Sequence, residues 1–220
     1  ERDEVKLEEQ AASRHTVEIE RDGKTFVIGI IELPTFYMDF EAARSGDPDY
    51  KSSTRDVERL VEELAAEGVD GMVVDLRNNG GGSLVEAREL SSLFMGRQPV
   101  VQIKGPDGRV DVVGGADEPA WDGPLAVLVN RLSASASEIF AGAIQDSGRG
   151  VVVGSRTFGK GSVQSVTPLS DGQLKLTQAM FFRPSGASTQ SRGILPDVLL
   201  PPTYDPEEIG ESALDEALPW

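Results

Sequence analysis

The chain has 220 residues, no cysteine and a formal net charge of −16 at pH 7. The lack of cysteine excludes a thiol nucleophile, a cysteine-ligated zinc site and a disulfide framework, and an acidic chain without a basic cluster argues against nucleic-acid or anionic-membrane partners. No apolar run reaches the roughly 18 residues of a membrane span, and residues 1–9 are too charged for a signal peptide. We therefore expect one large domain, cut from a longer protein or matured, with residues 1–14 frayed.

The first half of the chain predicts strands and helices in alternation. The predicted elements are a hairpin (15–20 and 25–33), a loop (39–53), a helix (54–67), a buried strand (71–76), a second helix (83–95) and a second hairpin (100–103 and 109–113). The helix over 54–67 rests on apolar residues at i, i+3, i+4 and i+7 from Val57, and Gly68 ends it. Ser83 and Glu86 form a capping box that opens the next helix.

The second half continues the pattern. Its predicted elements are an apolar strand (124–129), a helix (136–145), an apolar strand (150–154), an alternating strand (173–182), a Pro/Gly-rich connection (184–202) and an acidic tail (206–220). This order indicates an α/β domain over residues 15–205, with a mainly parallel central sheet and small β hairpins. Ligands of such folds bind at the carboxyl ends of the strands, which directs attention to residues 77–82 and 130–137.

Composition restricts which groups could perform catalysis. The single histidine, His15, falls in the polar amino-terminal hairpin and is expected to be a surface strand residue. Without cysteine or a suitable histidine, the nucleophiles left are serine and threonine, and the bases left are lysine and carboxylates. A serine–lysine pair is a known variant of the catalytic triad.

Ser135 follows a predicted buried strand and opens a predicted helix. With Glu138 three residues later it makes a capping box, which is a structural role. A serine at a helix amino terminus also lies beside unpaired N–H groups and the positive end of the helix dipole, and both favour a developing oxyanion. The two interpretations of Ser135 are compatible.

Two glycine-rich loops accompany this serine. Lys160 lies between Gly159 and Gly161, a setting in which lysine is usually solvated. Gly154 and Gly159 have the spacing of a phosphate-binding loop, but Gly161 stands where a serine or threonine should hold magnesium, so a nucleotide site is not expected. The three glycines at 80–82 exceed the needs of a turn, and they would let a peptide substrate approach the backbone closely.

Three motifs in register resemble those of the tail-specific, or C-terminal processing, proteases, above all the bacterial periplasmic branch. They are residues 75–82 (DLRNNGGG), 133–143 (SASASEIFAGA) and 157–164 (TFGKGSVQ), and weaker matches follow at 188–190, 193–197 and 217–220. The resemblance implies a β/α core like that of the crotonases and Clp-type peptidases and a location in the bacterial periplasm or cell envelope. We expect neither a metal nor a cofactor.

The resemblance also implies roles for individual residues. It makes Ser135 the nucleophile, Lys160 the general base and Gln164 the residue that orients the lysine ammonium, while the backbone amides of Gly81 and Ala136 form the oxyanion hole. It implies protein substrates that are unfolded or tagged and are cut near an apolar C-terminus. The family normally carries a PDZ domain that binds the substrate's terminal carboxylate. No such module is found in these 220 residues, so either it was removed or this member lacks it, and an adaptor or PDZ domain outside this chain is a candidate partner.

Lysine chemistry sets a condition on this site. The ordinary pKa of lysine is about 10.4, so a lysine base must be desolvated to be neutral near pH 7. Gln164 could fix the amine through its carbonyl oxygen without adding a negative charge that would raise the lysine pKa. Two carboxylates are second-tier structural candidates: Asp75, and Asp146, which ends the Ser135 helix and should have a cationic partner such as Arg149 or Arg77.

Two rival functions remain open. The first is a non-catalytic ligand-binding module of the same fold, and the second is a crotonase-like acyl-CoA enzyme, which also uses paired backbone amides. A binding module has no need to keep Ser135, Lys160 and Gln164 together, and an acyl-CoA enzyme leaves the serine–lysine pair unexplained. The sequence therefore favours a serine endopeptidase.

Overall fold

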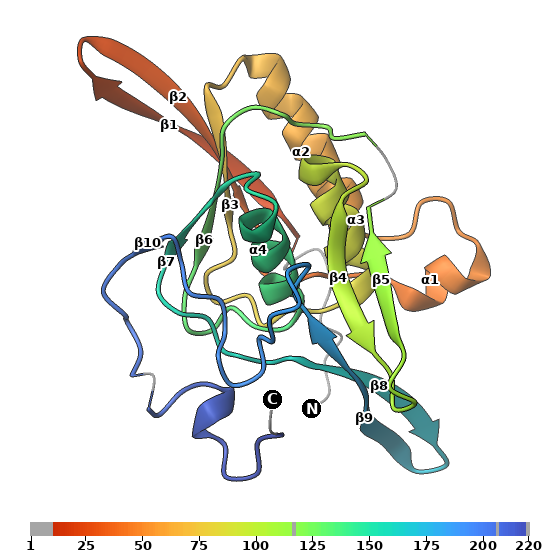
Figure 1. Cartoon of the computed structure of the whole chain (residues 1–220). Helices are drawn as coiled ribbons and strands as arrows, with labels where there is room; N and C mark the ends of the chain where they lie inside the picture. Colours follow the sequence, from red (N-terminus) through yellow and green to blue (C-terminus); the bar gives the residue numbers. More distant parts are fainter. Residues whose placement is uncertain (1–10, 116–117, 206, 219–220) are drawn as a thin grey trace, which may run out of the picture.

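The computed structural model describes residues 11–115, 118–205 and 207–218. Within these ranges, one sheet has the strand order β1-β2-β3-β6-β7-β10 and a second sheet has the order β5-β4-β9-β8 (Figure 1). The strands of the first sheet are β1 (Ser13–Arg21), β2 (Lys24–Glu32), β3 (Gly71–Asp75), β6 (Leu125–Val129), β7 (Val151–Gly154) and β10 (Val198–Leu199). Those of the second are β4 (Pro99–Lys104), β5 (Val110–Gly114), β8 (Ser162–Leu169) and β9 (Gly172–Phe182).

The central sheet is parallel from β2 to β10, and only its edge strand β1 runs antiparallel. This confirms the predicted α/β class with a mainly parallel sheet. The hairpin of β1 and β2 turns at Asp22 and Gly23, both with positive φ, as the Asp-Gly pair predicts. The hairpin of β4 and β5 is also confirmed.

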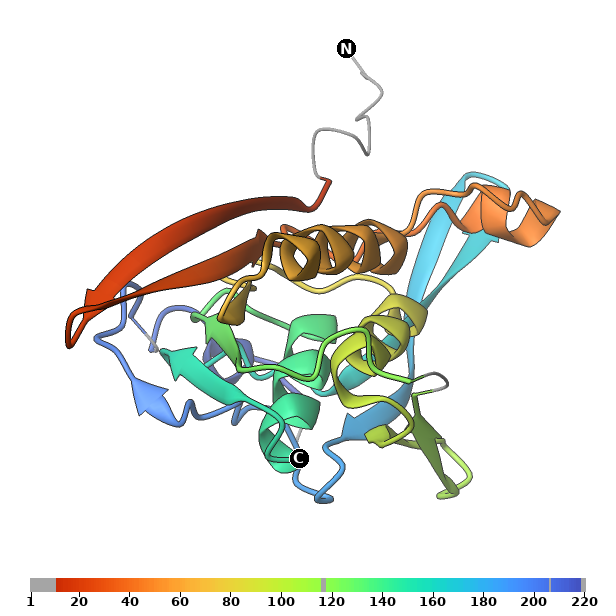
Figure 2. The same ribbon diagram turned by 90° about the horizontal axis from the view of Figure 1, so that it is seen from above.

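Three helices lie between the two sheets (Figures 1 and 2). They are α2 (Ser53–Glu67), α3 (Leu84–Met95) and α4 (Ala136–Asp146). Helix α2 begins at the Ser52 cap, ends at Gly68 in the left-handed conformation, and buries the apolar stripe that predicted it. In the core, the ring of Phe94 on α3 meets that of Phe140 on α4 edge to face, with centroids 5.9 Å apart.

The structure differs from the predicted elements in three places. The expected loop over 39–53 contains a short helix, α1 (Phe40–Ser45), because the Asp39 side chain accepts hydrogen bonds from the amides of Glu41 and Ala42. Strand β8 was not predicted, and it pairs with β9 along its whole length. Strand β1 already begins at Ser13, within the segment that was expected to be frayed, and residues 1–10 of that segment lie outside the described residues. No helix in the described ranges is long and apolar enough to cross a bilayer.

Candidate active site

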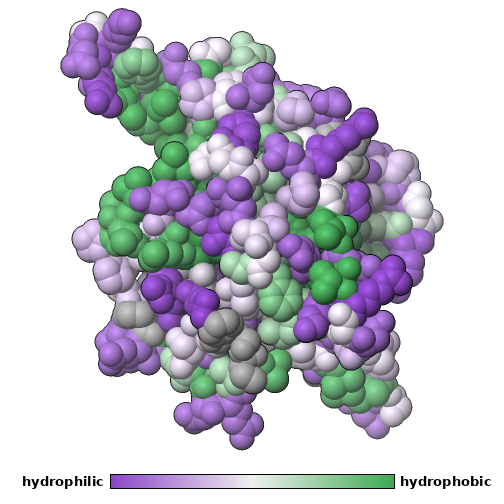
Figure 3. All heavy atoms as spheres, in the orientation of Figure 1, coloured by the Kyte–Doolittle hydropathy of each residue, from purple (hydrophilic) through white to green (hydrophobic). Residues whose placement is uncertain are grey.

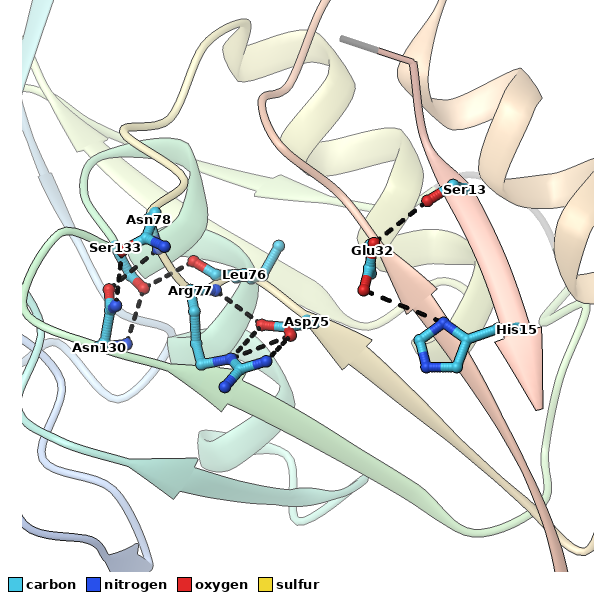
Figure 4. Close-up of polar contacts among 9 residues, drawn as sticks. All are labelled: Ser13, His15, Glu32, Asp75, Leu76, Arg77, Asn78, Asn130 and Ser133. Atoms are coloured by element: carbon cyan, nitrogen blue, oxygen red, sulfur yellow. Dashed lines mark hydrogen bonds and ion pairs between the residues drawn. The ribbon is translucent and has the colours of Figure 1, made fainter. Parts of the chain in front are cut away.

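The loops that follow β3 and β6 are tied together by polar contacts (Figure 4). Ser133 Oγ donates to the Leu76 carbonyl at 2.7 Å and accepts from the Asn130 amide at 3.0 Å. The Asn130 side chain accepts from the Asn78 N–H at 3.0 Å and donates to Asn78 Oδ1 at 2.8 Å. Since β3 and β6 are neighbours in the sheet, these bonds fix the two loops at its carboxyl edge as one unit.

This unit brings the glycine loop against the Ser135 turn. The Asn79 carbonyl accepts from the Ala134 amide at 3.0 Å. A Cβ added to Gly81 would lie 2.8 Å from the Cβ of Ser135 and 3.0 Å from the Ala136 nitrogen, closer than real side-chain contacts. Position 81 therefore requires glycine, and the structure places three of the predicted site residues side by side.

Ser135 occupies a strained backbone position at the amino terminus of α4. Its φ of 56° and ψ of −112° lie in a region that residues with a side chain rarely adopt. Such strain is of order 1–3 kcal/mol and persists only where the surroundings impose it. The side chain is partly exposed, so the turn presents the hydroxyl at the edge of the sheet.

Glu138 accepts hydrogen bonds from the serine turn and from the lysine loop, whereas the sequence predicted only a capping role for it. Its carboxylate is fully buried. Oε2 accepts from the amides of Ser135 and Lys160, both at 2.9 Å, while Oε1 accepts from the Gly159 amide at 2.8 Å and from Thr157 Oγ1 at 2.6 Å. One carboxylate thus joins the serine turn to the lysine loop. Its position three residues after Ser135 was visible in the sequence, whereas its burial and its other three donors were not.

The buried environment of Glu138 disfavours the charged form of its carboxyl group. Burial raises the pKa of this carboxyl from 4.5 to about 7, although the hydrogen bonds from Thr157 and the three amides act in the opposite direction. The net effect is a carboxyl that gains a proton near neutral pH. Its titration would change the hydrogen bonding beneath both Ser135 and Lys160.

Lys160 lies partly buried next to Gln164. Its Nζ donates to Gln164 Oε1 at 3.2 Å, and Gln164 Nε2 in turn donates to Thr177 Oγ1 on β9 at 3.3 Å. Burial lowers the pKa of Lys160, the positive charge of Lys175 lowers it further, and the carboxylates of Glu211 and Glu138 act in the opposite direction. The net change is toward the neutral amine that a base requires.

The two backbone amides that were expected to form the oxyanion hole differ in whether they already have a hydrogen-bond acceptor. The Gly81 amide donates to Oδ1 of the buried Asn79 at 2.9 Å, so in this conformation it is engaged within its own loop. Ala136 is the first residue of α4, where backbone N–H groups have no carbonyl partner within the helix. Gly81 thus lies beside the Ser135 turn with its amide already engaged by Asn79.

Asp146 has a different partner from the one expected. Its carboxylate accepts from both Nε and a terminal nitrogen of Arg183, the former at 3.2 Å, and from the Ser185 amide at 3.0 Å. Arg149 instead donates to backbone carbonyls, and Arg77 pairs with another carboxylate. The prediction of Arg149 or Arg77 was wrong because Arg183 reaches the end of α4 from the segment after β9, which the sequence does not reveal.

Asp75 and His15 each make local polar contacts at the ends of the strands that carry them (Figure 4). Asp75 ends β3 and accepts from the amide and the guanidinium of Arg77, at 2.6–3.0 Å. His15 is exposed on β1, with Nδ1 3.9 Å from Glu32 Oε1 on β2. Both contacts are structural, and they leave the histidine in the surface strand that the sequence predicted.

A cleft with a volume of about 700 Å³ lies along the carboxyl edge of the central sheet. Its lining includes Glu32, Asp75 and Asn130 at three strand ends, and Asn78 from the loop that leads to the glycines. Neither Ser135 nor Lys160 is among the described residues that line it. The two residues therefore do not form the walls of this cleft.

The sequence and fold match known proteins over most of the chain. The family model of peptidase family S41 matches residues 27–200. The tail-specific protease of Haemophilus influenzae is 39% identical over 229 residues, covering 100% of this chain and 30% of the relative. The chloroplastic C-terminal processing peptidase of Tetradesmus obliquus is 40% identical over 185 residues, covering 83% and 37%. A solved photosystem II D1 C-terminal processing protease has a TM-score of 0.71 at 33% identity, covering 89% of this chain and 48% of that one. The chain thus spans about a third to a half of the length of these relatives.

Proposed function

The chain belongs to peptidase family S41, and on that premise we propose that it is the core of a serine endopeptidase of the C-terminal processing type, with Ser135 as nucleophile and Lys160 as general base. The observation that carries the proposal is Glu138, which binds the backbone of both residues through one carboxylate oxygen. Burying a carboxylate costs folding free energy even when four donors satisfy it. We infer that Glu138 is kept there because it holds the nucleophile beside its base.

The reaction begins with a neutral Lys160. The amine takes the proton of Ser135 as its Oγ attacks the scissile carbonyl carbon, and the resulting ammonium returns that proton to the leaving amine. Water then attacks the acyl-enzyme with the lysine again as base. Burial and Lys175 favour the neutral amine, and Gln164 fixes its direction with an uncharged oxygen.

The tetrahedral intermediate requires donors for its oxyanion. The amides of Ala136 and Gly81 are the candidates, and the second becomes available when it leaves Asn79 Oδ1. One such donor is typically worth about 3 kcal/mol of transition-state stabilisation. Substrate binding therefore has to reorient the 79–81 segment for full activity.

We propose the substrates, their delivery and the location by analogy with the relatives. We assign protein substrates with exposed apolar C-termini, because the relatives are named tail-specific and C-terminal processing enzymes. Delivery falls to a PDZ domain or adaptor outside this chain, and the location is the bacterial periplasm or envelope. The alternative is a non-catalytic ligand-binding module of the same fold.

A fluorophosphonate probe separates the two functions. We expect it to label the wild-type chain at Ser135, to fail on Ser135→Ala, and to react far more slowly with Lys160→Ala, while circular dichroism shows all three chains folded. Cleavage of an unfolded reporter should be lost in both variants. Absence of labelling in the folded wild type, or full cleavage by Lys160→Ala, would reject the dyad in favour of the binding module.

A further inference from the structure

Residues 209–218, which we call the tail, lie against the loop that carries Lys160. The tail and the segment between β7 and β8 run side by side (Figure 1). The Glu211 amide donates to the Phe158 carbonyl at 3.0 Å, two residues before the lysine. The sequence predicted only an acidic segment here, and the family model ends at residue 200. The tail therefore reaches the proposed site from outside the matched range.

Arg131 forms a second link between the tail and the lysine loop. This buried side chain donates to the carbonyls of Thr157, at 2.6 Å, and Ile209, and it also donates to Ser212 Oγ at 3.4 Å. A Cβ added to Gly210 would overlap the guanidinium group, so the tail backbone lies directly on the arginine. One buried cation is thus shared between the tail and the start of the lysine loop.

Gln190 forms a third link, on the other side of Lys160. Its side chain is fully buried. Oε1 accepts from the Gly161 amide at 2.8 Å, while Nε2 donates to Glu211 Oε1 and to the Leu218 carbonyl, both at 2.9 Å. Both N–H groups and the oxygen of this amide therefore have partners. The bridge connects the tail to the residue that follows the lysine.

These polar links, rather than hydrophobic packing, hold the tail. Leu214 and Leu218 are 54% and 43% exposed, and no described tail residue belongs to the buried apolar core. Figure 3 shows mainly hydrophilic side chains at the bottom of the view, where the tail lies. Loss of one tail contact should therefore disturb the lysine loop more than the stability of the whole domain.

We propose that the tail is a brace for the lysine loop, and that Gln190 and Glu211 are positioning residues for Lys160. The proposal rests on the proposed function, because only a catalytic lysine needs a fixed position. Glu138 holds the loop through the amide of Lys160 itself, and the tail holds residues on both sides of it. Together these contacts limit the positions that the lysine amine can take.

Two measurements on the full chain test the brace. The rate of fluorophosphonate labelling reports on the proposed dyad, and hydrogen–deuterium exchange of residues 157–164 reports on the order of the loop whether or not the dyad works. Glu211→Leu removes an acceptor of Gln190, whereas Glu211→Gln keeps an acceptor oxygen. Both variants lose the same charge, so the difference between them isolates the hydrogen bond. We expect Glu211→Leu to label about fivefold more slowly than Glu211→Gln and to exchange the loop amides about fivefold faster, as loss of one hydrogen bond predicts.

The charge of Glu211 supplies a second readout that a merely structural role would not move. It raises the pKa of Lys160, so Glu211→Gln should label at least as fast as the wild type near pH 7. Gln190→Met breaks both ends of the bridge and should slow labelling by about tenfold or more. If that variant does not fold, as judged by circular dichroism, the Glu211 pair decides.

Glu216→Leu makes the same substitution at an exposed tail position and should change neither measurement. Equal labelling rates for Glu211→Leu and Glu211→Gln, or equal exchange of their loops, would overturn the brace. An unlabelled wild type would reject the proposed function. Exchange alone would then decide whether the tail orders the loop: faster exchange in Glu211→Leu supports that link, and equal exchange rejects it.

Discussion

The backbone amides of Ser135 and Lys160 donate to the same carboxylate oxygen, Oε2 of Glu138, at 2.9 Å each. The two residues belong to different loops, after β6 and β7, and a shared acceptor prevents these loops from separating. The other oxygen, Oε1, holds Thr157 and Gly159 from the lysine loop. The relative position of Ser135 and Lys160, the proposed nucleophile and base, is thus held in part by one buried side chain, and we propose that Glu138 is a positioning residue.

Replacing Glu138 by glutamine tests this dependence. The amide has one acceptor oxygen where the carboxylate has two, and its NH2 group would face N–H donors. We expect a loss of about 2–4 kcal/mol in the free energy of unfolding, since buried donors are left unsatisfied, together with slower fluorophosphonate labelling of the folded chain. Glu138→Asp keeps the charge and should recover part of the labelling rate. Wild-type stability and labelling in Glu138→Gln would show that the carboxylate positions nothing.

The raised pKa of Glu138 predicts how this residue affects stability with pH. Its carboxyl titrates near 4.5 when unfolded and near 7 when folded, so the folded chain binds the proton more tightly between these values. The contribution of Glu138 to stability is greatest below about pH 4.5 and falls by about 3 kcal/mol as the pH rises through 7. Urea unfolding of wild type and Glu138→Gln at several pH values isolates this group, because the other titrations cancel in the difference. A difference that is constant between pH 5 and 8 would contradict the prediction.

Removing the positive charge of Lys175 should change the pH dependence of activity. It lies on β9 opposite Val166, two positions from the Thr177 that contacts Gln164, and its positive charge lowers the pKa of Lys160. Lys175→Gln should raise the pKa of Lys160, the proposed base, and move the rising limb of kcat/KM to higher pH. The shift should shrink with added salt, because Lys175 is exposed. Lys24→Gln on β2 is the matched control, and an unmoved or acid-shifted limb for Lys175→Gln would exclude this electrostatic effect.

Comparing Gly81→Ala with Gly46→Ala separates the cost of backbone strain from the cost of a steric clash. Gly46 and Gly81 both have positive φ, but a Cβ at position 46 meets nothing within 4 Å, whereas at 81 it meets the Ala134 carbonyl oxygen at 2.7 Å and Ser135. We expect Gly46→Ala to lower stability by about 1 kcal/mol through strain alone, and Gly81→Ala by about 3 kcal/mol or more. Only Gly81→Ala should reduce fluorophosphonate labelling. Equal effects of the two substitutions would mean that the glycine loop does not abut Ser135.

The sequence predicts those features that a local pattern encodes. Asp22-Gly23 predicts the β1–β2 turn, and the apolar spacing from Val57 predicts helix α2. The structure has both elements where they were expected. Helix α1 was missed because one cap in a polar stretch is a weak signal. The role of Glu138 was missed because two of its donors come from residues 21 and 22 positions away and a third from 19. Contacts of this kind depend on how the loops pack at the sheet edge, which no single segment specifies.

The Asp146–Arg183 pair illustrates the same limit and yields a further prediction. The side chains are 11% and 16% exposed, and they join the end of α4 to the segment after β9. Removing either partner leaves an uncompensated charge in a mostly dry site, so Asp146→Asn and Arg183→Gln should each lower the free energy of unfolding by about 3 kcal/mol. The double variant should lose clearly less than the two single losses combined, because it removes both charges. Urea unfolding of the four chains gives this coupling, and additive losses would show that the two groups act independently and that Asp146 has some other use.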